Sequence, residues 1–223
     1  MTFPLQRDDD WYRMRLALPA RCPRVVIDSD AANEIDDPFA LAWALLSPER
    51  LRVEAVYATP YSFAHRRSTL NPHQLRHFAQ RGWEPATVVL PCFDPPAIGM
   101  ERSHTAILEV FDKLGLPDSG RVLRGSTHYL ASIDTPEHSE AVEHLITTAL
   151  ATPDDEPLYV VAIGCVTNIA NALLLAPAIA ERIVVVWTSG HPSHAPLPNP
   201  SFNLEQDLLA TRVGDAVRGA EPR

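Results

Sequence analysis

Three short apolar runs set the strongest constraint on how this chain can fold. They cover residues 24–27, 158–163 and 183–188, and polar residues do not alternate with apolar ones inside them. Runs of this kind are typical of strands that are buried on both faces, as in parallel sheets covered by helices. Segments with helical periodicity separate the runs, so the pattern predicts an α/β fold with a mostly parallel sheet flanked by helices.

A βαβ unit is predicted at the first of these runs. Residues 24–27 form its first strand, and residues 53–58 return as the second. Between them, Asp36 or Asp37 can cap a helix, and Pro38 suits the first helical position. The spacing of four apolar residues places them on one helix face, toward the core: Phe39, Ala42, Trp43 and Leu46.

The rest of the chain predicts further helices around the same sheet. They are expected in four places: residues 101–114, residues 137–151, a segment capped by Thr167 or Asn168 and ending at Leu175, and a polar segment from about Leu204. Residues 61–98 are rich in proline and have no sustained period, so they are expected to form a long irregular insertion. Residues 1–24 are expected to form an N-terminal extension of a single domain that covers residues 1–223.

Composition limits the classes of function. The 223 residues are 46% hydrophobic and 21% charged, which is ordinary for a globular domain and argues against disorder. The net charge is −9 and there is no long Lys/Arg cluster, so we expect no binding to nucleic acid or to an anionic membrane. We also expect no signal peptide and no membrane span, because no apolar stretch is long enough for either.

The three cysteines indicate a reducing compartment. Cys22, Cys92 and Cys165 lie far apart and form no CxxC pair, which suggests neither a zinc site nor a disulfide framework. The cytoplasm is therefore the expected location. Cys165 has no histidine partner in the sequence and is expected to pack as a small hydrophobe, while Trp43 and Trp187 are expected in the core.

The most informative segment is the acidic loop after the first strand. Residues 28–37 read Asp-Ser-Asp-Ala-Ala-Asn-Glu-Ile-Asp-Asp and hold five carboxylates. Open α/β sheets bind ligands at the carboxyl ends of their strands, and crowded carboxylates repel one another unless a cation compensates. Because the loop has no His or Cys, calcium or magnesium suits it better than zinc. The simpler alternative is that Asp36 and Asp37 cap the helix while Glu34 is solvated.

Spacing excludes three motifs of known mechanism. Ala32, Asn33 and Phe39 stand where an EF-hand that starts at Asp28 needs an Asp or Asn, a Gly and a Glu. The first eighty residues contain no glycine, which excludes both a dinucleotide fingerprint and a phosphate-binding P-loop. An Asp-x-Asp phosphotransferase, with Asp28 as nucleophile and Asp30 as acid, stays open.

Three segments occur in an order that is specific to one family. A strand with Asp-x-Asp and then Asp-Asp covers residues 25–37, a strand with Gly-x-x-Thr-Asn covers residues 160–170, and Phe-Asn stands at residues 202–203. Together they resemble the inosine-uridine-preferring nucleoside N-ribohydrolase family. The resemblance implies a nucleoside hydrolase fold that hydrolyses the N-glycosidic bond of small-molecule ribonucleosides to ribose and free base, and it allows a homo-oligomer.

The resemblance also implies roles for single residues. Asp30 and Asp37 would ligate a calcium ion, with the backbone carbonyl of Thr167 as a further ligand. Asp30 would also act as the catalytic residue that orients or deprotonates the attacking, calcium-bound water. The remaining implied roles are ribose binding by Asp36 and Asn203 and support of the loop by Asp28.

The sequence departs from the family in ways that bear on activity. Five residues separate its two acidic pairs where the family has three, and Ser201 stands where Glu commonly precedes Phe-Asn. The family's late Asp ligand and neighbouring His have no counterpart here, so the sheet is expected to lack its last elements and to expose apolar surface. His191 and His194 lie on the predicted substrate loop and could protonate the leaving base. The alternative function is a catalytically impaired remnant that binds calcium or nucleoside or assembles with other subunits.

Overall fold

A five-stranded parallel sheet forms the centre of the molecule. The computed structural model describes residues 7–66, 93–153, 155–190 and 201–217. The strands lie in the order β3-β2-β1-β4-β5, and every neighbouring pair is parallel, which confirms the predicted α/β fold class. The strands are β1 Arg24–Ser29, β2 Arg52–Ala58, β3 Val122–Arg124, β4 Leu158–Ala162 and β5 Ile183–Trp187.

Because the strands are parallel, their carboxyl ends all meet at one edge of the sheet. In β1, which is the central strand, Asp28 pairs with Tyr57 of β2 on one side and with Ala162 of β4 on the other. Loops that bind ligands in open α/β sheets gather at this edge. The acidic loop after β1 therefore lies at the middle of the edge.

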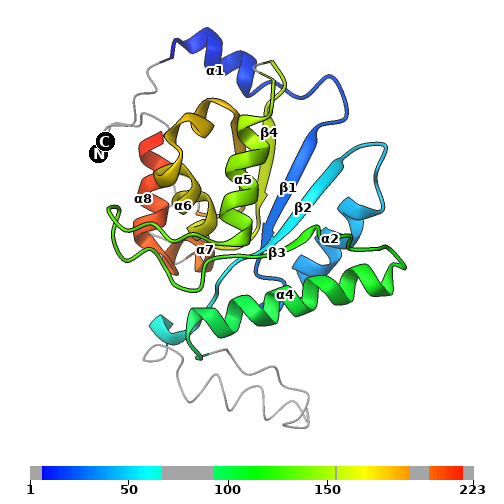
Figure 1. Ribbon diagram of the computed structural model, residues 1–223, viewed down its shortest axis with the longest axis vertical. Coiled ribbons are helices and arrows are strands. Elements are labelled where there is room, and N and C mark those ends of the chain that lie inside the picture. Colours follow the sequence, from blue (N-terminus) through cyan, green and yellow to red (C-terminus); the bar gives the residue numbers. More distant parts are fainter. Residues whose placement is uncertain (1–6, 67–92, 154, 191–200, 218–223) are drawn as a thin grey trace.

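Helices cover both faces of the sheet (Figure 1). Val26, Tyr57 and Val160 pack toward α5, α6 and α8 on one face, whereas Val25 and Ile27 pack toward α2 and α4 on the other. The described helices are α1 Asp9–Arg15, α2 Asp36–Leu45, α4 Pro96–Lys113, α5 Glu140–Leu150, α6 Thr167–Leu175, α7 Phe202–Glu205 and α8 Leu208–Val217, with the 3-10 turns η1 Ala64–Arg66 and η2 Pro177–Glu181.

Helix α2 turns its predicted apolar face away from the core. Phe39, Trp43 and Leu46 are 69%, 79% and 61% exposed, so the prediction that they are buried, including Trp43 as a core residue, is wrong. Leu41 on the opposite side is fully buried, and Ala42 is partly buried beside it. The prediction fails because apolar residues occupy both sides of this helix, so the hydrophobic period does not identify a single inner face.

Part of the predicted irregular insertion is ordered and helical. Helix α4 begins at Pro96 rather than at residue 101, because proline fits the first turn of a helix. Tyr61 and Ser62 are buried, and η1 follows them. The remainder of the insertion, residues 67–92, lies outside the described residues.

Capping residues set two other helix starts. Helix α5 begins at Glu140 rather than at residue 137, because the Ser139 hydroxyl accepts a hydrogen bond from the Val142 N–H (3.3 Å). The predicted N-terminal extension also contains a helix, α1, whose N-cap Asp8 accepts from the Trp11 N–H (2.8 Å). The described part of the extension, residues 7–24, therefore contains regular structure.

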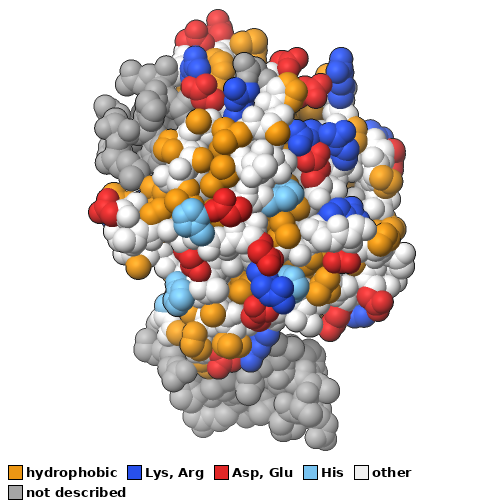
Figure 2. Space-filling model, viewed as in Figure 1, with side chains coloured by type: hydrophobic (Ala, Val, Ile, Leu, Met, Phe, Trp, Pro, Cys, Tyr) orange, Lys and Arg blue, Asp and Glu red, His pale blue; other side chains and the backbone are white. Residues whose placement is uncertain are grey.

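Charges of both signs are interspersed on the face that Figure 2 shows. Ion pairs join several charged residues of the molecule, including Arg102 with Asp94 (2.7 Å) and Arg124 with Glu101 (3.0 Å). Among the described residues, no helix combines the length and the apolar content that crossing a membrane requires.

Candidate functional site

Polar residues from five segments meet at the carboxyl edge of the sheet. Four of these segments follow β1, β2, β3 and β4, and the fifth joins α7 to α8. Hydrogen bonds link them across large distances in sequence, as between Asn168 and Asp28 and between Thr167 and Asp207. The edge therefore forms one connected polar site, which is the position expected for a ligand site in an open α/β sheet.

Asp30 and Asp37 form a buried pair of carboxyl groups. Their side chains interact with each other, and burial together with this proximity raises the pKa of Asp30 well above its usual range. Burial raises the pKa of Asp37 to about 6. Asp30 accepts a hydrogen bond from the Asn33 amide (3.0 Å), and Asp37 accepts one from the Ser29 hydroxyl (3.1 Å). None of the ion pairs in the described part of the chain involves either carboxyl group.

The donor chemistry of this pair fits a hard divalent cation. Two adjacent carboxyl groups without a Lys or Arg partner are the kind of oxygen ligands that calcium and magnesium prefer. The buried Oδ1 atom of Asn33 has no hydrogen-bond partner and offers a third oxygen beside Asp30. Within the described residues, however, no three His, Cys, Asp or Glu side chains converge in a way that could hold a metal ion. Any cation there needs carbonyl, amide or solvent oxygens to complete its coordination.

Asp28, which stands in β1 two residues before Asp30, is fully buried. The Asn168 amide donates to it (2.8 Å), while the Asn168 oxygen accepts from the Ser126 N–H (2.7 Å). Burial raises the pKa of Asp28 to about 7. A carboxyl group enclosed in this way has no access to a phosphate ester, which argues against the phosphotransferase alternative with Asp28 as nucleophile.

Thr167 is the first residue of α6, and a hydrogen bond to Asp207 fixes its side chain. Its hydroxyl donates to Asp207 (2.7 Å), which also accepts from the backbone N–H groups of Leu130 (2.8 Å) and Ala210 (2.9 Å). Asp207 thus ties the turn after β4 to the loop after β3 and caps α8. The sequence reasoning did not identify Asp207, because its partners are distant in sequence.

Two residues that the sequence predicts in the core, Cys165 and Trp187, lie close to the turn after β4. Cys165 is fully buried, and its thiol lies 3.2 Å from the Pro60 carbonyl oxygen. Burial raises the pKa of this thiol to about 12, so it is a packed thiol rather than a nucleophile. Trp187 is partly buried against the core, and its indole N–H donates to the Gly164 carbonyl (2.9 Å).

The two residues predicted to bind ribose lie on different helices and differ in their hydrogen bonds. Asp36 is the first residue of α2 and is exposed beside the buried Asp37. Asn203 is on α7, and its amide donates to the carbonyls of Ile163 (2.9 Å) and Thr188 (3.0 Å) at the ends of β4 and β5. The two histidines proposed as acids, His191 and His194, lie outside the described residues.

A glutamine and a tyrosine complete the wall of the site without having been predicted. The Gln206 oxygen accepts hydrogen bonds from the Tyr129 hydroxyl (2.9 Å) and the Ser62 N–H (3.2 Å). Both partners are donors here, which fixes the orientation of the amide and leaves its buried nitrogen without a partner. Burial, reinforced by nearby groups that include Asp30, raises the pKa of Tyr129. Only the position of Tyr129 after β3 and that of Gln206 near Asn203 could have indicated these two residues.

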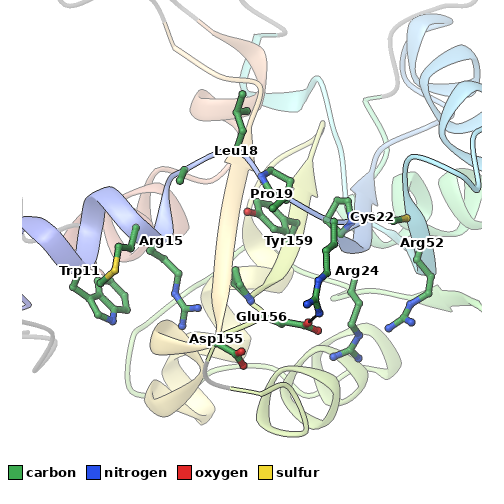
Figure 3. Close-up of a pocket in the computed structure, with 16 residues that line it drawn as sticks. Trp11, Arg15, Leu18, Pro19, Cys22, Arg24, Arg52, Asp155, Glu156 and Tyr159 are labelled. Carbon is green, nitrogen blue, oxygen red and sulfur yellow. Dashed lines mark hydrogen bonds and ion pairs between the residues drawn. The ribbon is translucent and has the colours of Figure 1, made fainter.

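A separate cavity of about 720 Å³ lies at the opposite, amino-terminal edge of the sheet (Figure 3). Arg24, Arg52 and Tyr159, at the starts of β1, β2 and β4, are among its lining residues. Three of its arginines pair with acids: Arg21 with Glu156 (3.1 Å), Arg24 with Glu54 (2.6 Å) and Arg52 with Glu54 (3.2 Å). None of the predicted site residues that the structure describes lines this cavity.

Comparisons with solved structures support the fold. A purine-preferring ribonucleoside hydrolase from Gardnerella vaginalis is 22% identical, with a TM-score of 0.57 over 85% of this chain and 56% of that one. A plant nucleoside hydrolase is 19% identical, with a TM-score of 0.53 over 86% and 56%. The type III effector protein XopQ, solved with adenosine diphosphate ribose, is 20% identical, with a TM-score of 0.55 over 98% and 60%. This chain thus spans 56–60% of the length of these three proteins.

Sequence comparisons identify the family. Curated protein sequences give no match. The model of the inosine-uridine preferring nucleoside hydrolase family matches residues 25–211. That span begins in β1, contains the acidic loop and the Thr167-Asn168 turn, and continues past Asn203 and Asp207. The chain belongs to the inosine-uridine preferring nucleoside hydrolase family.

Proposed function

We propose that this chain hydrolyses the N-glycosidic bond of ribonucleosides and releases ribose and free base, with calcium as its cofactor. The observation that carries the proposal is the buried pair Asp30–Asp37 at the carboxyl edge of the sheet, which forms no ion pair with a Lys, Arg or His that the structure describes. Family membership supports hydrolysis of nucleosides in general. The proposal adds the residues that perform it.

Asp30 is the proposed base. It takes a proton from the attacking water at its carboxylate, while the Asn33 amide holds that carboxylate in place. Asp36, which is exposed beside Asp37, binds ribose hydroxyl groups, and Asn203 holds the sugar from α7. Asp30, Asp37 and the Thr167 carbonyl would hold a hard divalent cation, which would supply activation of the attacking water by lowering its pKa. Sugar contacts that strengthen as the oxocarbenium-like transition state forms supply the remaining rate enhancement.

Protonation of the leaving base is proposed for His191 or His194. In the sequence they follow β5, whose carboxyl end lies at the edge that holds the site. A histidine suits this role because its usual pKa is near neutrality. Replacing each by Gln would separate the two candidates, since loss of the acid should affect nucleosides with poor leaving bases most strongly.

The test is ribose release from purine and pyrimidine ribonucleosides by the purified chain, with calcium and with a chelator. We expect chelator-sensitive release that falls at least a hundredfold in Asp30→Asn, because general base catalysis typically contributes about 10²–10⁴-fold. Glu34→Gln is the matched control, since Glu34 is an exposed acid on the same loop. It should retain release near the parent rate.

Folded protein that releases no ribose from any nucleoside would contradict the proposed reaction. In that case, calcium or nucleoside binding measured by calorimetry would support the alternative of a non-catalytic binding protein. Release that continues unchanged in Asp30→Asn would contradict the role of Asp30.

The cytoplasm is the proposed location. Two described cysteines, Cys22 and Cys165, are free thiols rather than disulfide partners. Free thiols persist in a reducing compartment. Mass spectrometry after alkylation of protein from intact cells would detect Cys22 as a free, exposed thiol if this is correct.

A further inference from the structure

Gln206 holds a buried hydrogen-bond donor that no group in the described part of the chain accepts. The residue is only 6% exposed, and its amide nitrogen has no hydrogen-bond partner. Nearly all buried polar groups in native proteins are paired, because an unpaired donor loses its bonds to water without replacing them. The two N–H bonds of this nitrogen therefore indicate an acceptor that arrives with a ligand.

The amide of Gln206 cannot turn over to pair its nitrogen elsewhere. Its oxygen accepts hydrogen bonds from the Ser62 N–H (3.2 Å) and the Tyr129 hydroxyl (2.9 Å). A reversed amide would place its own N–H groups against the Ser62 N–H, which can only donate. Ser62 is 1% exposed, so its N–H also needs the Gln206 oxygen. The backbone of Ser62 thus fixes the orientation of the amide.

Helix α7 directs Gln206 toward the carboxyl edge of the sheet. Gln206 is the C-cap of α7 and keeps a helical backbone (φ −59°, ψ −44°), three residues after Asn203. Side chains three residues apart share a helix face, and Asn203 donates to the Ile163 carbonyl at the end of β4 (2.9 Å). The other face of α7 carries Phe202, which stacks on Phe63 with the ring centroids 4.4 Å apart. Gln206 is therefore on the face of α7 that meets the site.

The neighbours of Gln206 contact the acidic loop. Tyr61, in the loop after β2 that also binds the Gln206 oxygen, donates to the Ala32 carbonyl (3.2 Å). On the other side, burial raises the pKa of Tyr129, and the charge of the nearby Asp30 adds to this effect. The unpaired amide thus lies beside the loop that carries the proposed base.

A sugar requires the donors that this amide adds to the site. Asp30, Asp36 and Asp37 offer carboxylate oxygens, which accept hydrogen bonds. The Asn203 amide nitrogen donates to two backbone carbonyls, which leaves the Asn203 oxygen for a sugar. A ribose hydroxyl that gives its proton to one of these oxygens keeps lone pairs that accept. Gln206 supplies donors for those lone pairs.

We propose that the Gln206 amide nitrogen binds the substrate by donating a hydrogen bond to a hydroxyl oxygen of ribose. This inference rests on the proposed function and adds to it a residue that selects for the sugar rather than for the base. Ser62 and Tyr129 position the amide for this contact. A nucleoside that lacks the bound hydroxyl leaves the buried donor unpaired, so it should be a poor substrate.

Release of free base from a ribonucleoside and from its 2′-, 3′- and 5′-deoxy analogues tests the contact. The readout is selectivity, the kcat/KM for the ribonucleoside divided by that for each analogue. The parent should discriminate about tenfold or more against one analogue, and Gln206→Glu should lose most of that discrimination. The variant keeps an oxygen toward Ser62 and Tyr129 but replaces the N–H donors. A general loss of activity lowers kcat/KM for all substrates and leaves selectivity unchanged.

The matched control is Glu205→Gln, the reverse exchange at the adjacent residue. Glu205 lies on the other face of α7 and pairs with Arg66 (2.9 Å), so its selectivity should equal that of the parent. Circular dichroism establishes that each variant is folded, and Gln206→Met provides a second variant if Gln206→Glu does not fold.

Two results would overturn the contact while the proposed reaction stands. One is a parent that hydrolyses all three deoxy analogues as fast as the ribonucleoside. The other is a selectivity that is unchanged in the folded Gln206 variant, as expected if a buried water satisfies the amide. A folded parent that releases no base contradicts the proposed reaction instead, and calorimetry of ribonucleoside binding then decides. A loss of affinity of about tenfold in Gln206→Glu would support the contact, whereas equal affinity or no binding by the parent would overturn it.

Discussion

At the residue scale, Gly164 determines how closely the turn after β4 approaches Asp30. A Cβ atom at this position would lie 2.4 Å from the Thr59 methyl group and 2.9 Å from Asp30 Oδ1. Both contacts are too short, so Gly164→Ala must displace the carboxyl group or the turn. We expect hydrolytic activity to fall at least tenfold and the free energy of unfolding to fall by about 1–3 kcal/mol, as in other overpacked sites.

The matched control for this change is Gly214→Ala in α8. A Cβ atom there meets nothing within 4 Å, and alanine is the better helix former. Its activity should equal that of the parent, and its stability should be equal or higher by up to about 1 kcal/mol. Urea denaturation and ribose release, measured on both variants, check the prediction. Equal activity and equal stability of the two variants would show that the site does not require the close approach of Gly164 to Asp30.

Sequence reasoning at this scale could identify residues that are close together in the chain. The acidic loop indicates Asp28, Asp30 and Asp37 because they share one short segment after a strand. Gln206 and Tyr129 are different, since they are 77 residues apart and meet only when α7 and the loop after β3 reach the same edge. Hydrogen bonds across such separations depend on the order of the strands, which local patterns do not contain.

At the scale of elements, the sequence indicates the positions of the strands more clearly than it indicates which face of a helix is buried. β1, β4 and β5 each contain a continuous apolar run, and any orientation of such a run turns apolar side chains toward the core. β3 has only three residues and gives no pattern of its own. For α2, the period indicates a helix correctly, but Leu41 and Trp43 lie on opposite sides and only packing determines which is buried.

An ion pair joins β1 to β2 near the amino-terminal ends of the two strands. Arg24 of β1 donates to both carboxylate oxygens of Glu54 on β2, at 2.6 and 2.7 Å. These bonds to Arg24 hold the pKa of Glu54 below its usual value. A carboxyl group whose pKa is lowered on folding adds stability above its unfolded pKa, about 4.3, and loses that contribution as the pH falls through the folded value.

Replacing this acid should therefore have a pH-dependent effect. Glu54→Gln should lower the free energy of unfolding by about 1 kcal/mol at pH 7, after allowance for solvent screening, and the difference from the parent should shrink as the pH falls below about 4. The control is Glu156→Gln, whose pair with Arg21 is largely exposed and should matter little. Urea denaturation at a series of pH values measures both. If the difference in free energy of unfolding between Glu54→Gln and the parent grew as the pH fell, the ion pair would not be the cause of the difference.

At the scale of the whole molecule, the sheet order β3-β2-β1-β4-β5 determines which loops meet. The central strand carries the acidic loop, so both of its neighbours contribute to the same site. The order also leaves β5 at one edge, next to a cavity of about 590 Å³ lined by Ile169, Leu173 and Trp187 among others. Parallel order follows from the βαβ pattern, whereas the position of each strand follows from tertiary packing, and the sequence alone does not determine it.

A cation bound in the acidic loop after β1 should raise the stability of the whole fold. A ligand that binds the folded state alone stabilises it by about 2.7 kcal/mol at a hundredfold excess over Kd, which corresponds to a rise in Tm of about 5–10 °C for a domain of this size. Calcium should therefore raise the Tm of the parent chain, and EDTA should reverse the rise. Magnesium, run in parallel, measures the preference between the two ions.

Asp30→Ala and Asp37→Ala should each abolish the rise, because each removes one of the two buried carboxylates that can balance the cation's charge. Glu34→Ala removes an exposed acid from the same loop and should preserve it, which separates binding at the buried pair from general attraction to an acidic chain. Differential scanning calorimetry measures all four proteins. A parent whose Tm is unchanged by calcium would show that the buried pair binds no cation, and a rise that persists in Asp37→Ala would place the cation elsewhere. The readout needs no substrate, so it tests the cation site whether or not the chain hydrolyses nucleosides.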